Sequence, residues 1–133
     1  MGGLPWVADI EELTLKNENY RVSRWTGKYL QMTLMSLKKG EIIDLEMHSE
    51  NDQFIRVEKG SGRIFMGKSR ENLDYVQEVQ DDWVVFIPAG YWHTLKNTGQ
   101  GELKVYSLYG PAEHPKDTVH KTYKEAAEEH HDH

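Results

Sequence analysis

Short runs of β-favouring residues, each bounded by turn residues, are the feature of this sequence that most constrains its fold. Apolar and polar residues alternate within the runs, and no long segment before residue 111 has the 3.6-residue period of an amphipathic helix. Turns such as Lys39-Gly40 and Pro88-Ala89-Gly90 separate the runs. The expected strands cover residues 20–25, 29–37, 41–48, 53–58, 62–66, 83–87, 93–97 and 103–109. This spacing predicts an all-β sandwich or closed barrel, because antiparallel sheets must hide their edges.

The last part of the chain has a different pattern. Two prolines make residues 111–115 an extended connector, and Thr122 to Glu125 fits a capping box that opens a short acidic helix over Ala126–Glu129. We therefore predict three parts, and we expect the tail to be peripheral. They are an N-terminal segment that packs on the barrel (1–27), the barrel itself (28–110), and a connector with a short helical tail (111–133).

Charge and cysteine content exclude several classes of function. The 133 residues carry 16 Lys and Arg against 22 Asp and Glu, and the basic residues are scattered, which argues against nucleic-acid and membrane partners. No signal-peptide pattern begins the sequence and no apolar run approaches ~18 residues, so we expect a cytoplasmic protein. Because there is no cysteine, a metal site would need histidine, carboxylate or amide ligands.

Two of these ligand types stand side by side on the strand expected at 41–48. Residues two apart in a strand share a face, so Glu46 and His48 are predicted to point the same way, together with Ile42 and Asp44. The other face would carry only apolar residues, at positions 43, 45 and 47. An outward apolar row on a barrel strand predicts a second layer or a homodimer interface.

Two further polar residues follow turns. Gln53 opens a strand whose inward face would be Gln53, Ile55 and Val57, and His93 follows the turn at 88–90. Pro88 fixes φ in that turn and Gly90 permits a close backbone approach.

These residues fall into two spaced motifs. The first, G-x5-H-x-H-x3,4-E-x6-G, fits from Gly40 to Gly60, with Glu46 and His48 in the histidine places and Gln53 in the glutamate place. The second, G-x5-P-x-G-x2-H-x3-N, fits from residue 82 to residue 97. Its Pro, Gly, His and Asn places are occupied by Pro88, Gly90, His93 and Asn97, and Asp82 replaces the first glycine.

The two motifs resemble those of the cupin superfamily. The resemblance implies a small jelly-roll β-barrel, usually dimeric, with a divalent metal inside, held here by Glu46, His48, Gln53 and His93. Two imidazoles, one carboxylate and one neutral amide resemble a 2-His-1-carboxylate iron site, and the set also suits Mn, Ni, Co or Zn. The chain is further similar to short bacterial single-domain cupins that are labelled mannose-6-phosphate isomerase-like, a label that establishes no reaction.

Three functions fit this pattern. A metal-binding cupin would act on a small polar molecule, by sugar or oxoacid isomerisation or by Fe-dependent oxygenation. A non-catalytic cupin would bind a small molecule or sugar, with or without a metal. A metal-free, epimerase-like barrel would use His48 or His93 as general base. Gln53 would ligate a metal, hold a water, or only replace a lost glutamate. The sequence assigns no catalytic residue and leaves open whether the protein is an enzyme.

The aromatic residues divide into two expected groups. Four are expected in the core: Phe54, Phe65, Trp83 and Phe86. One of four others is expected to line the pocket: Tyr91, Trp92, Tyr106 or Tyr109.

Overall fold

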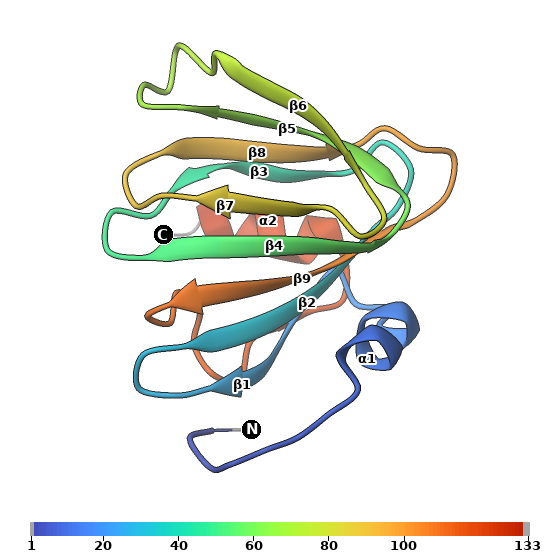
Figure 1. Cartoon of the computed structure of the whole chain (residues 1–133), viewed down its shortest axis with the longest axis vertical. Helices are drawn as coiled ribbons and strands as arrows, with labels where there is room; N and C mark the ends of the chain where they lie inside the picture. The colour runs from blue at the N-terminus through green and yellow to red at the C-terminus, as the bar shows by residue number, and fades with distance from the viewer. Residues whose placement is uncertain (1, 132–133) are drawn as a thin grey trace.

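Two antiparallel sheets make up most of the computed structural model, which describes residues 2–131 (Figure 1). The six-stranded sheet has the order β10-β1-β2-β9-β4-β7, with β1 Arg21–Thr26, β2 Gln31–Leu37, β4 Asp52–Lys59, β7 Val84–Ile87, β9 Leu103–Gly110 and β10 Val119–His120. The four-stranded sheet has the order β3-β8-β5-β6, with β3 Ile42–Met47, β5 Ser61–Gly67, β6 Tyr75–Gln80 and β8 Trp92–Asn97. The all-β jelly-roll prediction is confirmed.

The core lies between the two sheets and is built from the inward residues of each strand. Gln53, Ile55 and Val57 are buried on β4, as their alternation predicts. Leu37 from β2 and Leu103 from β9 are fully buried in the same cluster. Burial of this apolar surface stabilises the barrel, and it fixes the strand register that brings the site residues together.

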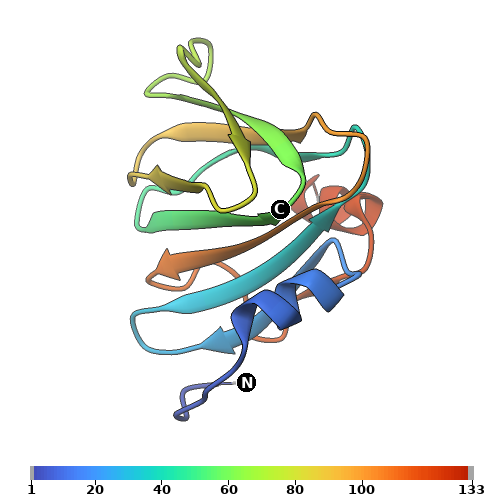
Figure 2. The same cartoon turned by 45° about the vertical axis from the view of Figure 1, so that its right-hand side comes forward.

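Two short helices accompany the sheets. Helix α1 (Ile10–Lys16) is capped by Asp9, whose Oδ1 accepts a hydrogen bond from the backbone N of Glu12 at 3.1 Å. It contacts β2, β4 and β9 (Figure 2). Helix α2 (Tyr123–His131) begins where the capping box predicts it, since Thr122 Oγ1 accepts from Glu125 N at 3.2 Å. No helix of the described residues is long and apolar enough to cross a membrane.

A β-bulge in β3 changes which residues share the face of Glu46. Ile43 pairs with Leu95 on β8, but Glu46 pairs with His93, so β3 has one residue more than its partner between these two pairs. Ile43 therefore points into the core beside Glu46, and Met47 is exposed. The prediction that Ile42 and Asp44 share the face of Glu46 is wrong, and so is the single apolar row at 43, 45 and 47.

The motif positions explain two unusual backbone conformations. Gly60 has φ of 93°, and a Cβ there would lie 2.5 Å from the carbonyl oxygen of Glu102, so only glycine fits. Asp82, which replaces the first glycine of the second motif, has φ of 75°, the one positive φ of a non-glycine residue in the described chain. Arg56 donates to Asp82 Oδ1 at 3.0 Å and so helps to hold this strained turn.

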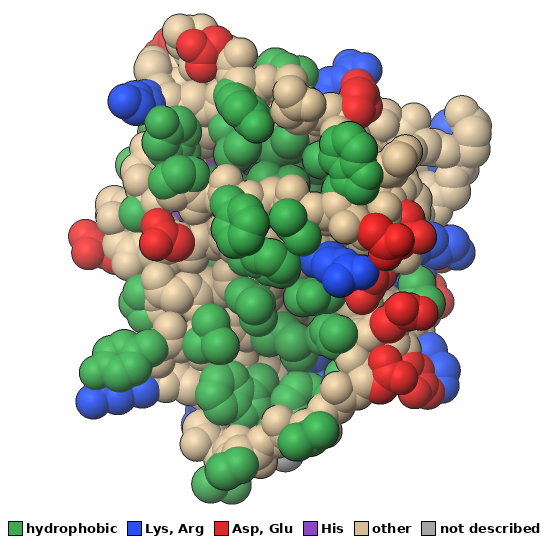
Figure 3. Space-filling view, viewed as in Figure 1, with side chains coloured by type: hydrophobic (Ala, Val, Ile, Leu, Met, Phe, Trp, Pro, Cys, Tyr) green, Lys and Arg blue, Asp and Glu red, His purple; other side chains and the backbone are tan. Residues whose placement is uncertain are grey.

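The predicted aromatic core residues lie elsewhere. Phe86 is 68% exposed and Trp83 48% exposed, and Phe54 and Phe65 are half-buried. Phe54 contacts Phe86 edge to face, with ring centroids 5.2 Å apart. Hydrophobic side chains gather over β4, β7 and β9 on the face shown in Figure 3. The prediction of four core aromatics is wrong because Phe54, Phe65 and Phe86 each stand between two buried neighbours on their strands, so that alternation turns them to the outer face.

Candidate metal centre

Three predicted ligands meet between the sheets. Glu46 on β3 and His93 on β8 are cross-strand neighbours, and His48 follows the end of β3. Glu46 Oε1 lies 3.3 Å from His48 Nε2 and 3.5 Å from His93 Nε2. One donor atom from each residue lies within 4.8 Å of the other two. The structure therefore brings Glu46, His48 and His93 together, from segments 45 residues apart.

These separations suit a divalent metal. A metal that binds nitrogen and oxygen at ~2.0–2.2 Å keeps neighbouring donors about 3.0 Å apart in octahedral geometry and about 3.4 Å apart in tetrahedral geometry. The two measured distances to Glu46 Oε1, 3.3 and 3.5 Å, agree with this spacing.

His93 forms a hydrogen bond through Nδ1, and its Nε2, which points toward Glu46, has no hydrogen-bond partner among the described residues. Nδ1 lies 3.0 Å from the carbonyl oxygen of Tyr91, which can only accept, so Nδ1 carries the proton. Nε2 then has a lone pair, is buried, and forms no hydrogen bond with the described residues. This lone pair faces the carboxylate of Glu46. Two electron-rich atoms at this distance in a buried site need a cation between them.

The ring of His48 is oriented in the same way. Its Nδ1 lies 3.2 Å from Oε1 of Glu113, which turns Nε2 toward Glu46. A carboxylate that accepts the outer N–H of a ligating histidine is the usual support of a metal centre.

Gln53 approaches from β4, on the other sheet. It is 3% exposed, and its Nε2 donates to Tyr109 Oη at 3.2 Å and to Ser107 Oγ at 3.4 Å. Its Oε1 is buried and accepts no hydrogen bond from the described residues. This oxygen is available as a fourth donor, and the expectation that Gln53 ligates stays a prediction.

The ionisation of the cluster is strongly coupled. Burial by itself would raise the pKa of Glu46, but the hydrogen bond with His48 and the charge of that ring hold the pKa well below its usual range. Burial would lower the pKa of His48, yet its bonds to Glu113 and Glu46 raise it to about 9. Without a metal, His48 is thus an imidazolium between two carboxylates. A metal would take the place of its Nε2 proton.

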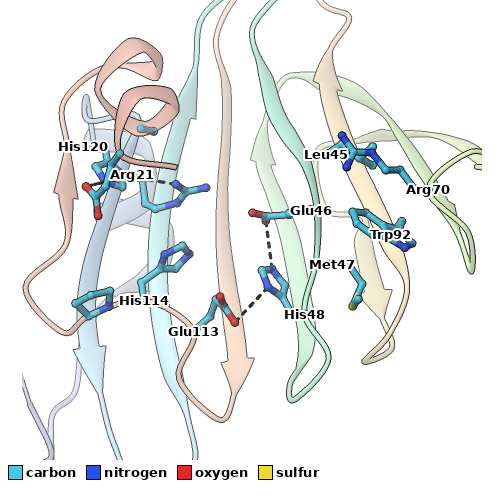
Figure 4. A pocket seen from close by; sticks show the side chains of 13 residues that line it. Arg21, Leu45, Glu46, Met47, His48, Arg70, Trp92, Glu113, His114 and His120 are labelled. Atoms are coloured by element: carbon cyan, nitrogen blue, oxygen red, sulfur yellow. Dashed lines mark hydrogen bonds and ion pairs between the residues drawn. The ribbon is translucent and has the colours of Figure 1, made fainter. Parts of the chain in front are cut away.

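A cavity of about 540 Å³ opens onto the cluster (Figure 4). Glu46 and His48 line it at β3. Trp92 lines it beyond β3, beside Met47 and Arg70, and is the one of the four candidate aromatic residues that does so. The opposite side is formed by residues that sequence analysis missed, namely Arg21, Glu113, His114, Pro115, His120, Ala126 and Glu129.

The connector and tail therefore form a wall of the cavity, and the expectation of a peripheral tail is wrong. Arg21 and His120 are cross-strand neighbours on β1 and β10 although they lie 99 residues apart. The one hint in the sequence is the pair of histidines, His114 and His120, in a segment that is otherwise extended and polar.

The comparisons with known proteins agree with this fold. Residues 33–109 match the cupin domain family. The chain is 47% identical over 125 residues to the protein YrkC of Bacillus subtilis (strain 168), covering 94% of this chain and 67% of that protein. It is 40% identical over 111 residues to the protein L612 of Acanthamoeba polyphaga mimivirus, covering 83% of this chain and 68% of that protein. The crystal structure of BH2720 from Bacillus halodurans is similar with a TM-score of 0.93 and 48% identity, covering 94% of this chain and 95% of that one. The chain belongs to the cupin superfamily.

Proposed function

We propose that this protein is a metal-dependent cupin that acts on a small polar molecule in the cavity beside Glu46, His48 and His93. The observation that carries the proposal is the buried Nε2 of His93, which lies 3.5 Å from Oε1 of Glu46 and has no hydrogen-bond partner among the described residues. A divalent cation satisfies both atoms, with Gln53 Oε1 as a further donor.

The bound metal would act as a Lewis acid that polarises a carbonyl or hydroxyl oxygen of the substrate, or as an Fe centre for oxygenation. The chain's own residues would hold the site in shape. Tyr91 and Glu113 fix the two histidine rings through their Nδ1 atoms. The carboxylate of Glu113 also lines the cavity, where it can accept a hydrogen bond from a bound molecule.

Elemental analysis of protein purified without chelator or affinity tag tests the proposal. We expect one divalent metal per chain. An oxygen-consumption screen against catechols, β-diketones and sugar acids then separates the reactions. Fe with oxygen uptake supports oxygenation, whereas Zn or Mn without uptake supports isomerisation of a sugar or oxoacid. Protein that binds no metal, even after incubation with Fe(II), Mn(II), Ni(II) and Zn(II), would refute the proposal.

A second candidate is a non-catalytic small-molecule or sugar-binding cupin that works without a metal. The observation that favours it is His48, which as an imidazolium lies between the carboxylates of Glu46 and Glu113, at 3.3 and 3.2 Å, and compensates one of their two charges. Metal-free protein that binds a sugar and turns over none of the screened compounds would support this alternative.

A further inference from the structure

Arg21 is a buried cation without an anionic partner. It is 7% exposed and lies in the cavity wall opposite Glu46 (Figure 4). Among the described residues, no carboxylate forms an ion pair with it, and its Nε is buried without a hydrogen bond. A guanidinium is rarely buried unpaired, because the loss of hydration must be offset by an anion.

The rest of the guanidinium is held in place. Arg21 Nη1 lies 3.4 Å from His120 Nδ1, and His120 Nε2 lies 2.6 Å from Glu129 Oε2 on α2. The carboxylate of Glu129 accepts the Nε2 proton, so Nδ1 of His120 has the lone pair that accepts from Arg21. The ring of Tyr20 lies 5.5 Å from the guanidinium carbon. This network positions Arg21 and leaves the edge that carries Nε free.

A second nitrogen without a partner lies in the same wall. Nε2 of His114 is buried and has no hydrogen-bond partner among the described residues. The His114 ring packs edge to face on Tyr109, with centroids 5.3 Å apart. Arg21 is a permanent cation in this wall and so forms a site for oxygen atoms that carry negative charge, and the neutral ring of His114 contributes at most one N–H beside it.

The charge of the cavity agrees with an anion. The residues that line the cavity include Arg21, the exposed Arg70 and three carboxylates, those of Glu46, Glu113 and Glu129, so with neutral histidines their net charge is −1. A divalent metal at Glu46 reverses this balance and leaves one net positive charge. A monoanion then makes the cavity neutral.

We propose that Arg21 anchors the carboxylate of a small hydroxy or oxo acid whose other oxygen reaches the metal centre. The placement of the ligand's other oxygen at the metal centre rests on the proposed function. A carboxylate suits the anchor because its two oxygens are coplanar and match one edge of a guanidinium. His120 and Glu129 are positioning residues for Arg21.

Calorimetric titration with acids and their neutral counterparts tests this proposal. The probes are gluconate against glucose and glycolate against ethylene glycol, with inorganic phosphate as a separate arm. We expect at least one acid to bind about tenfold or more tightly than its neutral counterpart, as a charge-assisted hydrogen bond implies. Arg21→Gln should abolish this preference without loss of metal. Arg63→Gln, which removes an exposed arginine paired with Glu78 on β6, should retain it.

Three results would overturn the assignment: equal binding of acid and neutral probe, an unchanged preference in Arg21→Gln, or tighter binding of phosphate than of either acid. If Arg21→Gln does not fold, Arg21→Lys replaces it, since lysine keeps the positive charge but has no planar guanidinium edge. Arg21→Lys should weaken acid binding several-fold, and an unchanged acid affinity would refute the proposal. Titrations of chelator-treated protein are run in parallel and measure the preference of Arg21 for acids in the absence of a metal. A protein that binds no metal would then refute only the proposed function.

Discussion

The stability of the metal-free protein should fall as pH rises from 6.5 to 9, and His48 should be the cause. The pKa of His48 is raised from 6.5 to about 9 by the carboxylates of Glu113 and Glu46. A raised pKa in the folded state contributes stability that is fully present below the unfolded pKa and is lost as pH passes through the folded pKa. The shift of about 2.5 units corresponds to at most about 3 kcal/mol, at 1.36 kcal/mol per unit.

Urea unfolding of chelator-treated protein at pH 6, 7.5 and 9 measures this loss. The matched control is His48→Gln, which keeps a polar side chain but cannot be protonated. We expect the difference in free energy of unfolding between wild type and His48→Gln to shrink steadily from pH 6 to pH 9. Metal-loaded wild type should lack this decline, because the metal takes the place of the His48 proton. A difference independent of pH in the metal-free pair would show that His48 is neutral there and would refute the coupling to Glu46 and Glu113.

Three further predictions concern stability and assembly. Burial and Arg21 lower the pKa of His114 to about 4. The free energy of unfolding should therefore fall by up to about 3 kcal/mol as pH falls from 6.5 toward 4. In urea titrations, His114→Gln should remove this part of the pH dependence. Asn97 is 2% exposed and makes three hydrogen bonds with backbone atoms, one of them fully buried. Asn97→Ala should therefore lower the free energy of unfolding by about 2–4 kcal/mol while the folded protein keeps its metal, and a loss below 0.5 kcal/mol would contradict this role. We also expect a homodimer at micromolar concentration, through the exposed aromatic face around Phe86, with a light-scattering mass of one chain as the contrary result.

The strands were predictable because alternation and turn residues mark them directly. All eight expected strands are present, with ends shifted by at most two residues. Strand β6 was missed because most of its residues are exposed and no apolar face marks it. Strand β10 has only two residues, and α1 is too short for a helical period to show. The bulge in β3 could not be read from the sequence, since residues 42, 43, 45 and 47 are all apolar and leave no clean alternation whose phase could be seen to change.

The residues of the metal cluster could be predicted from motif spacing, and the residues of the opposite cavity wall could not. Glu46, His48 and His93 are defined by turns and alternation within two short segments. Arg21 and His120 face the cavity only because β1 pairs with β10, a contact between the two ends of the chain. No local pattern signals such a pairing, so the residues that select the ligand appear only in the folded structure.

Metal retention in a pair of isosteric variants shows whether Glu46 holds a divalent metal in this cluster. Glu46→Gln removes the negative charge of the cluster's carboxylate at nearly constant volume, and Gln53→Glu adds a carboxylate at a buried position whose amide oxygen is free. Metal content is measured by mass spectrometry after dialysis against a weak chelator. We expect wild type to retain about one metal per chain, Gln53→Glu to retain as much or more, and Glu46→Gln to lose most of it, because an uncompensated dication in a low-dielectric interior is costly. Equal retention in Glu46→Gln and wild type would show that Glu46 is not a ligand and would contradict the account.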